Sequence, residues 1–347
     1  MGRKRFKWNN LIVLSVAIVL VVFITIAASI LHKTDKTVFT IDDYEVTDDE
    51  FNHILQNMKA LTVNYFKEKY NVDYSKNFWK SSYGGKNPSE YAKQEAMNYL
   101  LKIKTEQIIM KENGIIEDLS YDAINKHLIK ENERRKKELE NKRPIYGPVQ
   151  YNITEYYSYY QNINRQALVE KWAKNFGHTL SDEFLEGYYD EIKDHYFKKA
   201  DSFIYEKISV KTEPNGMGIL EEFKKKASIA KLTTDEAKQS MDRFITVERS
   251  FIDPKEIKKE ASIENQLYEA FLELNEGDFT EIYQMDNEDV MFRMIEKQHN
   301  GYEHYSDVKN TIVKIYAQEQ LDYKVSLRLK NVNVKINDPI YDKIIVD

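Results

Sequence analysis

Few side chains of this 347-residue chain combine the residue types and spacings that catalysis needs. There is no cysteine, which excludes disulfides, cysteine nucleophiles and cysteine metal ligands. No histidine stands with carboxylates in a metal-binding spacing, and no Gly-x-Ser-x-Gly, phosphate-loop or dinucleotide motif occurs. We therefore expect neither a cofactor nor a metal, and interpret the histidines as surface residues. They are His32, His53, His127, His178, His195, His299 and His304.

Two clusters of aromatic residues are the other candidates, because large rigid side chains can bind unfolded polypeptides. The loop of residues 77–87 carries Phe78, Trp79 and Tyr83. A second cluster, in which Tyr157 and Tyr159 are the candidates for client binding, consists of Tyr151, Tyr156, Tyr157, Tyr159 and Tyr160. The structural alternative is that the loop aromatics form a satellite core. In the second cluster the same alternative makes Tyr156 and Tyr160 core residues, with Tyr157 and Tyr159 at the surface.

The N-terminal residues predict a membrane anchor. Residues 11–31 form an uncharged apolar run of 21 residues, long enough at about 1.5 Å per residue to cross a hydrocarbon core of roughly 30 Å. The basic residues before it favour a cytoplasmic N-terminus, with the remainder outside. A cleaved signal peptide is the alternative, since Ala27, Ala28 and Ser29 are small. The net charge of −6 argues against nucleic acid as a partner.

Residues 37–198 predict two short strands followed by helices. Thr47 and Glu50 have the spacing of a capping box, and Pro88 suits the first turn of a helix. Apolar residues at helical spacing predict buried stripes that include Leu61, Tyr99 and Ile163. The expected strands are 37–41 and 44–46, and the expected helices are 47–70, 88–113, 120–141, 153–174 and 181–197.

The remainder predicts an α+β segment and a return to the first part. The expected strands are 203–211, 246–252, 279–285, 290–295 and 331–336, and the expected helices are 218–227, 233–244, 261–274 and 302–328. The N-terminal and C-terminal strands have no partner strands nearby in the sequence. A strand edge without a partner exposes N–H and C=O groups that can pair with another chain. We therefore expect Val332, Val334 and Ile336 to pack with residues 38–41 and with the helix that carries Phe51 and Leu55.

One stretch carries a more specific signal. Leu274–Thr280, LNEGDFT, ends a helix at Gly277, and Asp289–Met294, DVMFRM, follows as a strand. This order and spacing resembles the C-terminal half of a parvulin-type peptidyl-prolyl isomerase domain. Upstream, residues 38–198 resemble the N-terminal chaperone region of SurA/PrsA-type foldases, which places the two regions in that family's order.

The resemblance implies a small apolar cup that twists a prolyl bond. The family uses a His on the first strand, a Met and a Phe on the helix, and a His on the last strand. Aligned by their flanks, these positions hold Lys207, Ile263, Leu267 and Val290. All four depart from the family, so we expect negligible isomerase activity, although Ile263 and Leu267 keep an apolar cup possible.

The expected fold is mostly α with an α+β parvulin-like domain. The expected regions are a basic segment (1–10), an anchor (11–31), a helical chaperone lobe (37–198), the parvulin-like domain (199–299) and a returning helix and strand (300–347). The hypothesis is a membrane-anchored extracytoplasmic foldase or chaperone that binds unfolded or exported polypeptides. An active divergent prolyl isomerase and a structural scaffold of a membrane complex are the alternatives.

Overall fold

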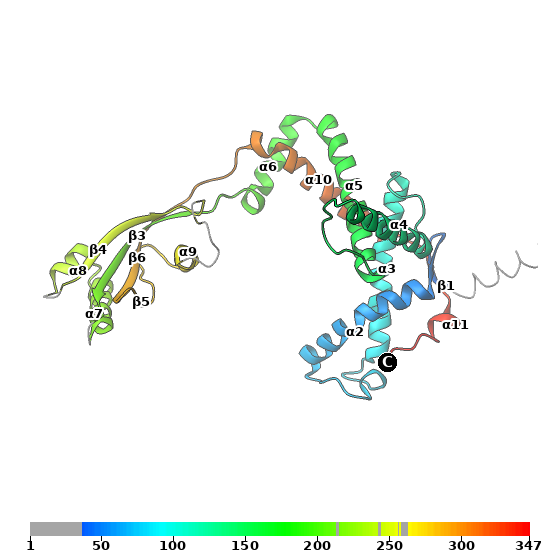
Figure 1. The fold of residues 1–347 in the computed structure, drawn as a ribbon, viewed down its shortest axis with the longest axis horizontal. Helices are drawn as coiled ribbons and strands as arrows, with labels where there is room; N and C mark the ends of the chain where they lie inside the picture. The colour runs from blue at the N-terminus through cyan, green and yellow to red at the C-terminus, as the bar shows by residue number, and fades with distance from the viewer. Residues whose placement is uncertain (1–36, 213–214, 242–243, 256, 258–262) are drawn as a thin grey trace, which may run out of the picture. The chain divides into compact units, whose positions relative to one another are not determined.

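The computed structural model describes residues 37–212, 215–241, 244–255, 257 and 263–347. These residues form two compact units, each treated by itself below (Figure 1). Unit 1 contains the described residues up to Thr179 together with Val313–Asp347, and unit 2 contains Leu180–Ile312. The predicted anchor, residues 11–31, lies outside the described residues. Among the helices that the structure describes, none is long and apolar enough to cross a membrane.

Unit 1 is helical, with one small sheet. Helix α10 begins in unit 2 and ends in unit 1. The elements are β1 (Thr37–Ile41), β2 (Tyr44–Thr47), α2 (Asp48–Tyr70), η1 (Phe78–Lys80), α3 (Pro88–Glu112), α4 (Tyr121–Glu140), α5 (Ile153–Thr179), α10 (Tyr305–Leu329), β7 (Val334–Ile336) and α11 (Asp338–Tyr341).

The helix starts follow from local side-chain chemistry. Thr47 and Ser120 accept hydrogen bonds from backbone N–H groups three residues later, and Asn87 does the same before Pro88. Each cap satisfies one of the N–H groups that a helix start leaves without a partner. The buried stripes are narrower than the spacing predicted, since Leu61, Tyr99 and Ile163 are exposed.

The sheet of unit 1 joins the two distant parts of the chain. Its strand order is β2-β1-β7, and β1 pairs antiparallel with β7, with Phe39 opposite Ile336 and Ile41 opposite Val334. The expected pairing of these strands is therefore confirmed. Packing on α2 differs from the expectation, because Ile336 is exposed and Tyr341 of α11 contacts Phe51 instead, with ring centroids 5.8 Å apart.

Unit 2 is built on a four-stranded antiparallel sheet of order β4-β3-β6-β5. Helix α6, which the sequence assigned to the first lobe, is grouped with this unit. The elements are α6 (Asp182–Tyr196), β3 (Ser202–Lys211), α7 (Gly216–Ile229), α8 (Thr234–Gln239), β4 (Thr246–Ile252), α9 (Ile263–Leu272), β5 (Tyr283–Met285) and β6 (Glu288–Gln298).

Each face of this sheet has its own apolar core. Side chains alternate along a strand, so neighbours on β6 serve opposite faces. Met291 packs with Leu220 and Phe223 of α7, whereas Phe292 packs with Leu267 of α9. Helices α7 and α8 therefore cover one face, and α9 covers part of the other.

Candidate peptide-binding site

A cavity of about 250 Å³ lies between α9 and the β5–β6 hairpin of unit 2. Leu267 and Phe292 form its apolar base, since both are buried in the core beneath α9. Ile263 stands at the first turn of α9 and is 55% exposed. The cavity, called the cup below, is lined by Ile263, Gln266, Leu267, Tyr283, Gln284, Met285 and Phe292.

The hairpin turn positions three of the lining residues. Asp286 and Asn287 both have positive φ, of 46° and 64°, as a two-residue hairpin turn with the right-handed strand twist requires. Met285 therefore pairs with Glu288, and Tyr283 pairs with Val290. This brings Tyr283, Gln284 and Met285 to the mouth of the cup.

The four positions aligned with the parvulin site separate into two groups. Ile263 and Leu267 line the cup. Val290 is fully buried in the core beneath the helix, and Lys207 lies on β3 opposite Phe292. The Nζ of Lys207 is 3.4 Å from Oε2 of Glu288, so this ammonium is paired with a carboxylate.

The side chains that line the cup can bind a ligand by contact, but they include no group suited to acid–base catalysis. Among the described residues that line it there is no His, Asp, Glu, Lys or Arg. Its polar groups are the amides of Gln266 and Gln284 and the phenol of Tyr283. Amides and phenols can donate to a peptide carbonyl, and the apolar base can hold an apolar side chain.

Comparison with known proteins gives similar structures but no family model and no curated relative. A SurA-like chaperone of Campylobacter jejuni is 15% identical, with 86% of this chain and 98% of that chain covered and a TM-score of 0.28. The foldase PrsA of Lactococcus lactis is 10% identical, with 88% and 96% covered and a TM-score of 0.25. PrsA of Bacillus subtilis is 14% identical, with 90% and 94% covered and a TM-score of 0.19.

The chain is thus similar, over most of its length, to SurA-like chaperones and PrsA foldases. These are the proteins that the sequence resembles. With TM-scores this low, the likeness by itself assigns neither an activity nor a site.

Two of the three loop aromatics of unit 1, Phe78 and Trp79, are core residues rather than a client surface. Phe78 is fully buried and Trp79 nearly so, while Tyr83 is half-buried. Phe66 of α2 lies edge-on to Phe78, with ring centroids 5.7 Å apart. The satellite-core interpretation is therefore correct for Phe78 and Trp79, and neither is accessible to a client in this structure.

Tyr157 is also buried, although both interpretations of its cluster placed it at the surface. Its hydroxyl donates to Oε1 of Glu50 at 2.8 Å, and Lys104 Nζ lies 2.8 Å from the same oxygen. Both side chains of this ion pair are 1% exposed. Burial, together with the charge of Glu50, raises the pKa of Tyr157, so the phenol remains a donor.

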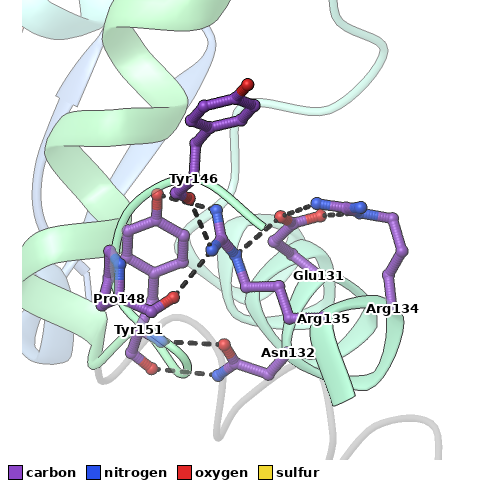
Figure 2. A network of polar contacts seen from close by, with 7 residues as sticks. All are labelled: Glu131, Asn132, Arg134, Arg135, Tyr146, Pro148 and Tyr151. Atoms are coloured by element: carbon purple, nitrogen blue, oxygen red, sulfur yellow. Dashed lines mark hydrogen bonds and ion pairs between the residues drawn. The ribbon is translucent and has the colours of Figure 1, made fainter. Parts of the chain in front are cut away.

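Tyr151 of the same cluster belongs to a polar network that holds the loop between α4 and α5, as Figure 2 shows. Arg135 of α4 is buried and lies over the ring of Tyr151, 4.3 Å from its centroid. It donates to the carbonyl oxygens of Tyr146 and Pro148 and to the hydroxyl of Tyr151. Tyr159, half-buried, stacks on Tyr151 with centroids 5.0 Å apart. One face of the Tyr159 ring is therefore covered by another residue of the protein.

Of the seven lining residues, the sequence assigns only Ile263 and Leu267 to the site. The other five are Gln266, Tyr283, Gln284, Met285 and Phe292. The signal for Tyr283 and Met285 was present, because Asp286-Asn287 between two extended segments predicts a tight hairpin. The sequence places Phe292 on the last strand, but the face of the sheet toward which its side chain points depends on the register of that strand. A register shift of one residue exchanges the two faces of a strand.

Proposed function

We propose that the chain is a membrane-anchored, extracytoplasmic foldase-type chaperone that holds unfolded or partly folded exported polypeptides and does not isomerise them. The observation that supports this most directly is the cup of unit 2. It has an apolar base, an exposed apolar rim at Ile263, and no acid–base side chain among its described lining residues.

The size of the cup suits one large apolar side chain of a client. Full burial of a Leu-sized or Phe-sized side chain contributes about 1.5–3 kcal/mol. A single contact of this size gives weak binding, because association loses translational and rotational freedom. Weak binding is what a chaperone that must release its clients requires.

Isomerisation would need more than an apolar contact. The barrier to prolyl rotation is about 18–20 kcal/mol. At the aligned positions that hold His in the family, this chain has Lys207, paired with Glu288, and Val290, which is fully buried. We infer that the cup binds ground-state segments without stabilising the twisted bond.

An active but divergent prolyl isomerase is the second candidate. It is favoured by the apolar cup itself, since Ile263 and Leu267 supply the apolar surface that a proline ring requires. Against it stands the absence of His at the two aligned strand positions, Lys207 and Val290.

The test is suppression of aggregation of a reduced, unfolded model protein by residues 37–347. We expect Ile263→Glu to reduce suppression several-fold, because a carboxylate at the rim opposes burial of an apolar side chain. The matched control is Leu272→Glu, the same kind of change on the same helix at a position 40% exposed that does not line the cup. Equal suppression by wild type and Ile263→Glu would remove the cup from the mechanism.

A further inference from the structure

The four-stranded sheet of unit 2 has two unlike edges. At one edge, β5 has only three residues. Beyond β5, the N–H of Gly277 donates to the carbonyl oxygen of Met294 at 2.7 Å, and the N–H of Thr280 donates to that of Phe292 at 2.8 Å. The loop before β5 therefore covers this part of the edge of β6. At the other edge, β4 extends over seven residues. Among the described residues, no strand pairs with the outer side of β4.

Strand β4 lacks several of the devices that normally protect an edge, and its only charged side chains are Glu248 and Arg249. Its sequence, TVERSFI, has no Pro, Gly or Lys. Its pairing with β3 is in register over all seven residues, from Thr246 opposite Ser209 to Ile252 opposite Phe203, with no bulge. Native edges are commonly blunted by Pro, Lys, bulges or short length. The outer edge of β4 therefore presents a regular row of N–H and C=O groups.

Most side chains on this edge are accessible, and one of them is a large aromatic ring. Residues 248–251 are all exposed, and Phe251 is 50% exposed. Arg249 and Phe251 lie opposite Glu206 and Ile204 of β3, so they share one face of the sheet. Glu248 and Ser250 lie on the other face.

We propose that the outer edge of β4 binds an extended segment of a non-native polypeptide by strand addition; this rests on the proposed function of holding such chains. Main-chain hydrogen bonds make the contact tolerant of sequence, and alternate side chains supply preference. An aromatic or β-branched residue beside Phe251 and an acidic residue beside Arg249 are preferred, as cross-strand pairs of these kinds stabilise sheets.

A second copy of this chain is a poorer occupant of the same edge. Two-fold antiparallel pairing over all seven residues makes residue 249 the centre of the ladder. Arg249 then lies directly opposite the same residue of the second copy. Like charges directly opposite one another destabilise a strand pair. An extended client segment need not place a positive charge opposite Arg249, so this repulsion does not arise.

Hydrogen exchange tests the proposal directly. The full-length chain in detergent micelles is exchanged with and without reduced, carboxymethylated α-lactalbumin as the unfolded probe. We expect the fast-exchanging amides of residues 246–252 to become protected when the probe binds, and those of residues 283–285 to remain unchanged. Binding of the probe without new protection in β4 overturns the proposal. The proposal is also overturned if, without the probe, the amides of β4 become more protected as the protein concentration rises. The occupant of the edge is then a second copy of the chain.

Proline substitutions add a functional measurement. Along β4, consecutive N–H groups point alternately toward β3 and outward. Of Arg249→Pro and Ser250→Pro, one therefore removes a donor to β3 and lowers the melting temperature, while the other removes only an outward donor. We expect the thermally neutral variant to bind the probe roughly tenfold more weakly, the equivalent of one or two hydrogen bonds. The alanine variant at the same position is the matched control.

The outcomes separate this proposal from the proposed function. Absence of probe binding by the wild type overturns both. Wild-type binding that the thermally neutral proline variant retains in full overturns strand addition alone and leaves the chaperone function standing.

Discussion

Only one of the two hydrogen bonds of the capping box predicted for Thr47 and Glu50 is formed in the structure. Thr47 caps α2 by accepting from the N–H of Glu50 at 3.4 Å, as the sequence predicts. The carboxylate, however, does not return to the cap. It turns inward to Lys104 and Tyr157, because pairing a buried charge outweighs a second capping bond.

His53 lies beside this pair and is not the surface residue that the sequence suggested. Its ring is edge-on to Tyr157, with centroids 5.3 Å apart, and also contacts the ring of Tyr121. Neither ring nitrogen has a hydrogen-bond partner among the described residues. Burial lowers the pKa of His53 below its ordinary value of 6.5, and the charge of Glu50 opposes this only in part.

The lowered pKa predicts a loss of stability in mild acid. As pH falls below 6.5 toward the folded-state pKa, the unfolded chain binds a proton at His53 that the folded chain does not. We expect the urea midpoint of residues 37–347 to fall between about pH 7.5 and about pH 5.5. His53→Phe should show a smaller fall, whereas His127→Phe, at an exposed position, should keep the wild-type fall. An unchanged pH dependence in His53→Phe would show that its protonation is not linked to folding.

The sequence predicts the burial of a single residue well where neighbours in the sequence decide it, and poorly where residues far away in the sequence decide it. Helical spacing identified Phe51, Ile54 and Leu55 as buried, since one helix face suffices to place them. It misplaced Leu61, because the width of a buried stripe depends on which helices pack against it. The partner of Glu50 lies 54 residues away at Lys104, and no local pattern specifies that pair.

At the scale of elements, the segment after α10 completes the sheet of unit 1. The N–H of Asp42 donates to Asn333 at 2.8 Å, and that of Asn337 donates to Val38 at 2.9 Å. Ile344 and Val346 are buried, whereas Ile345 between them is 77% exposed. Strand β1 is therefore the central strand only while this segment is present.

Deletion of Asn333–Asp347 should destabilise unit 1. Loss of two buried apolar side chains alone removes about 3–6 kcal/mol, at about 1.5–3 kcal/mol each. Hydrogen exchange of residues 37–47 should accelerate strongly, while β3 of unit 2 should keep its protection. Val346→Asp should reproduce part of the effect, and Ile345→Asp should not. Unchanged exchange of residues 37–47 in the deletion would mean that β7 does not support β1.

Element boundaries were predictable where caps are local and less so where strands end. Asn87-Pro88 and Ser120 marked helix starts because the capping side chain lies next to the helix. Of the strand expected over residues 279–285, only Tyr283–Met285 forms a continuous strand, and Phe279 makes an isolated bridge to Arg293. Of the strand expected over residues 331–336, only Val334–Ile336 forms a strand. Strand length is fixed by the partner strand, and the partner of β7 is β1, near the other end of the chain.

At the scale of the whole molecule, the proposed anchor is a prediction of its own. Residues 11–31 are apolar and uncharged over a length that suits a membrane span. We expect N-terminal sequencing of the membrane-associated protein to begin at or near Met1. A start near Ser29 would instead indicate a cleaved signal peptide.

The central claim is that the cup binds polypeptide segments without catalysing prolyl rotation. One NMR exchange measurement on a proline-containing peptide, mixed with residues 37–347, reports both properties. We predict shifts or broadening of the peptide resonances, with cis–trans exchange remaining at its uncatalysed time of roughly tens to hundreds of seconds. Exchange cross-peaks from much faster interconversion, lost in Ile263→Glu, would contradict the account and identify an active isomerase.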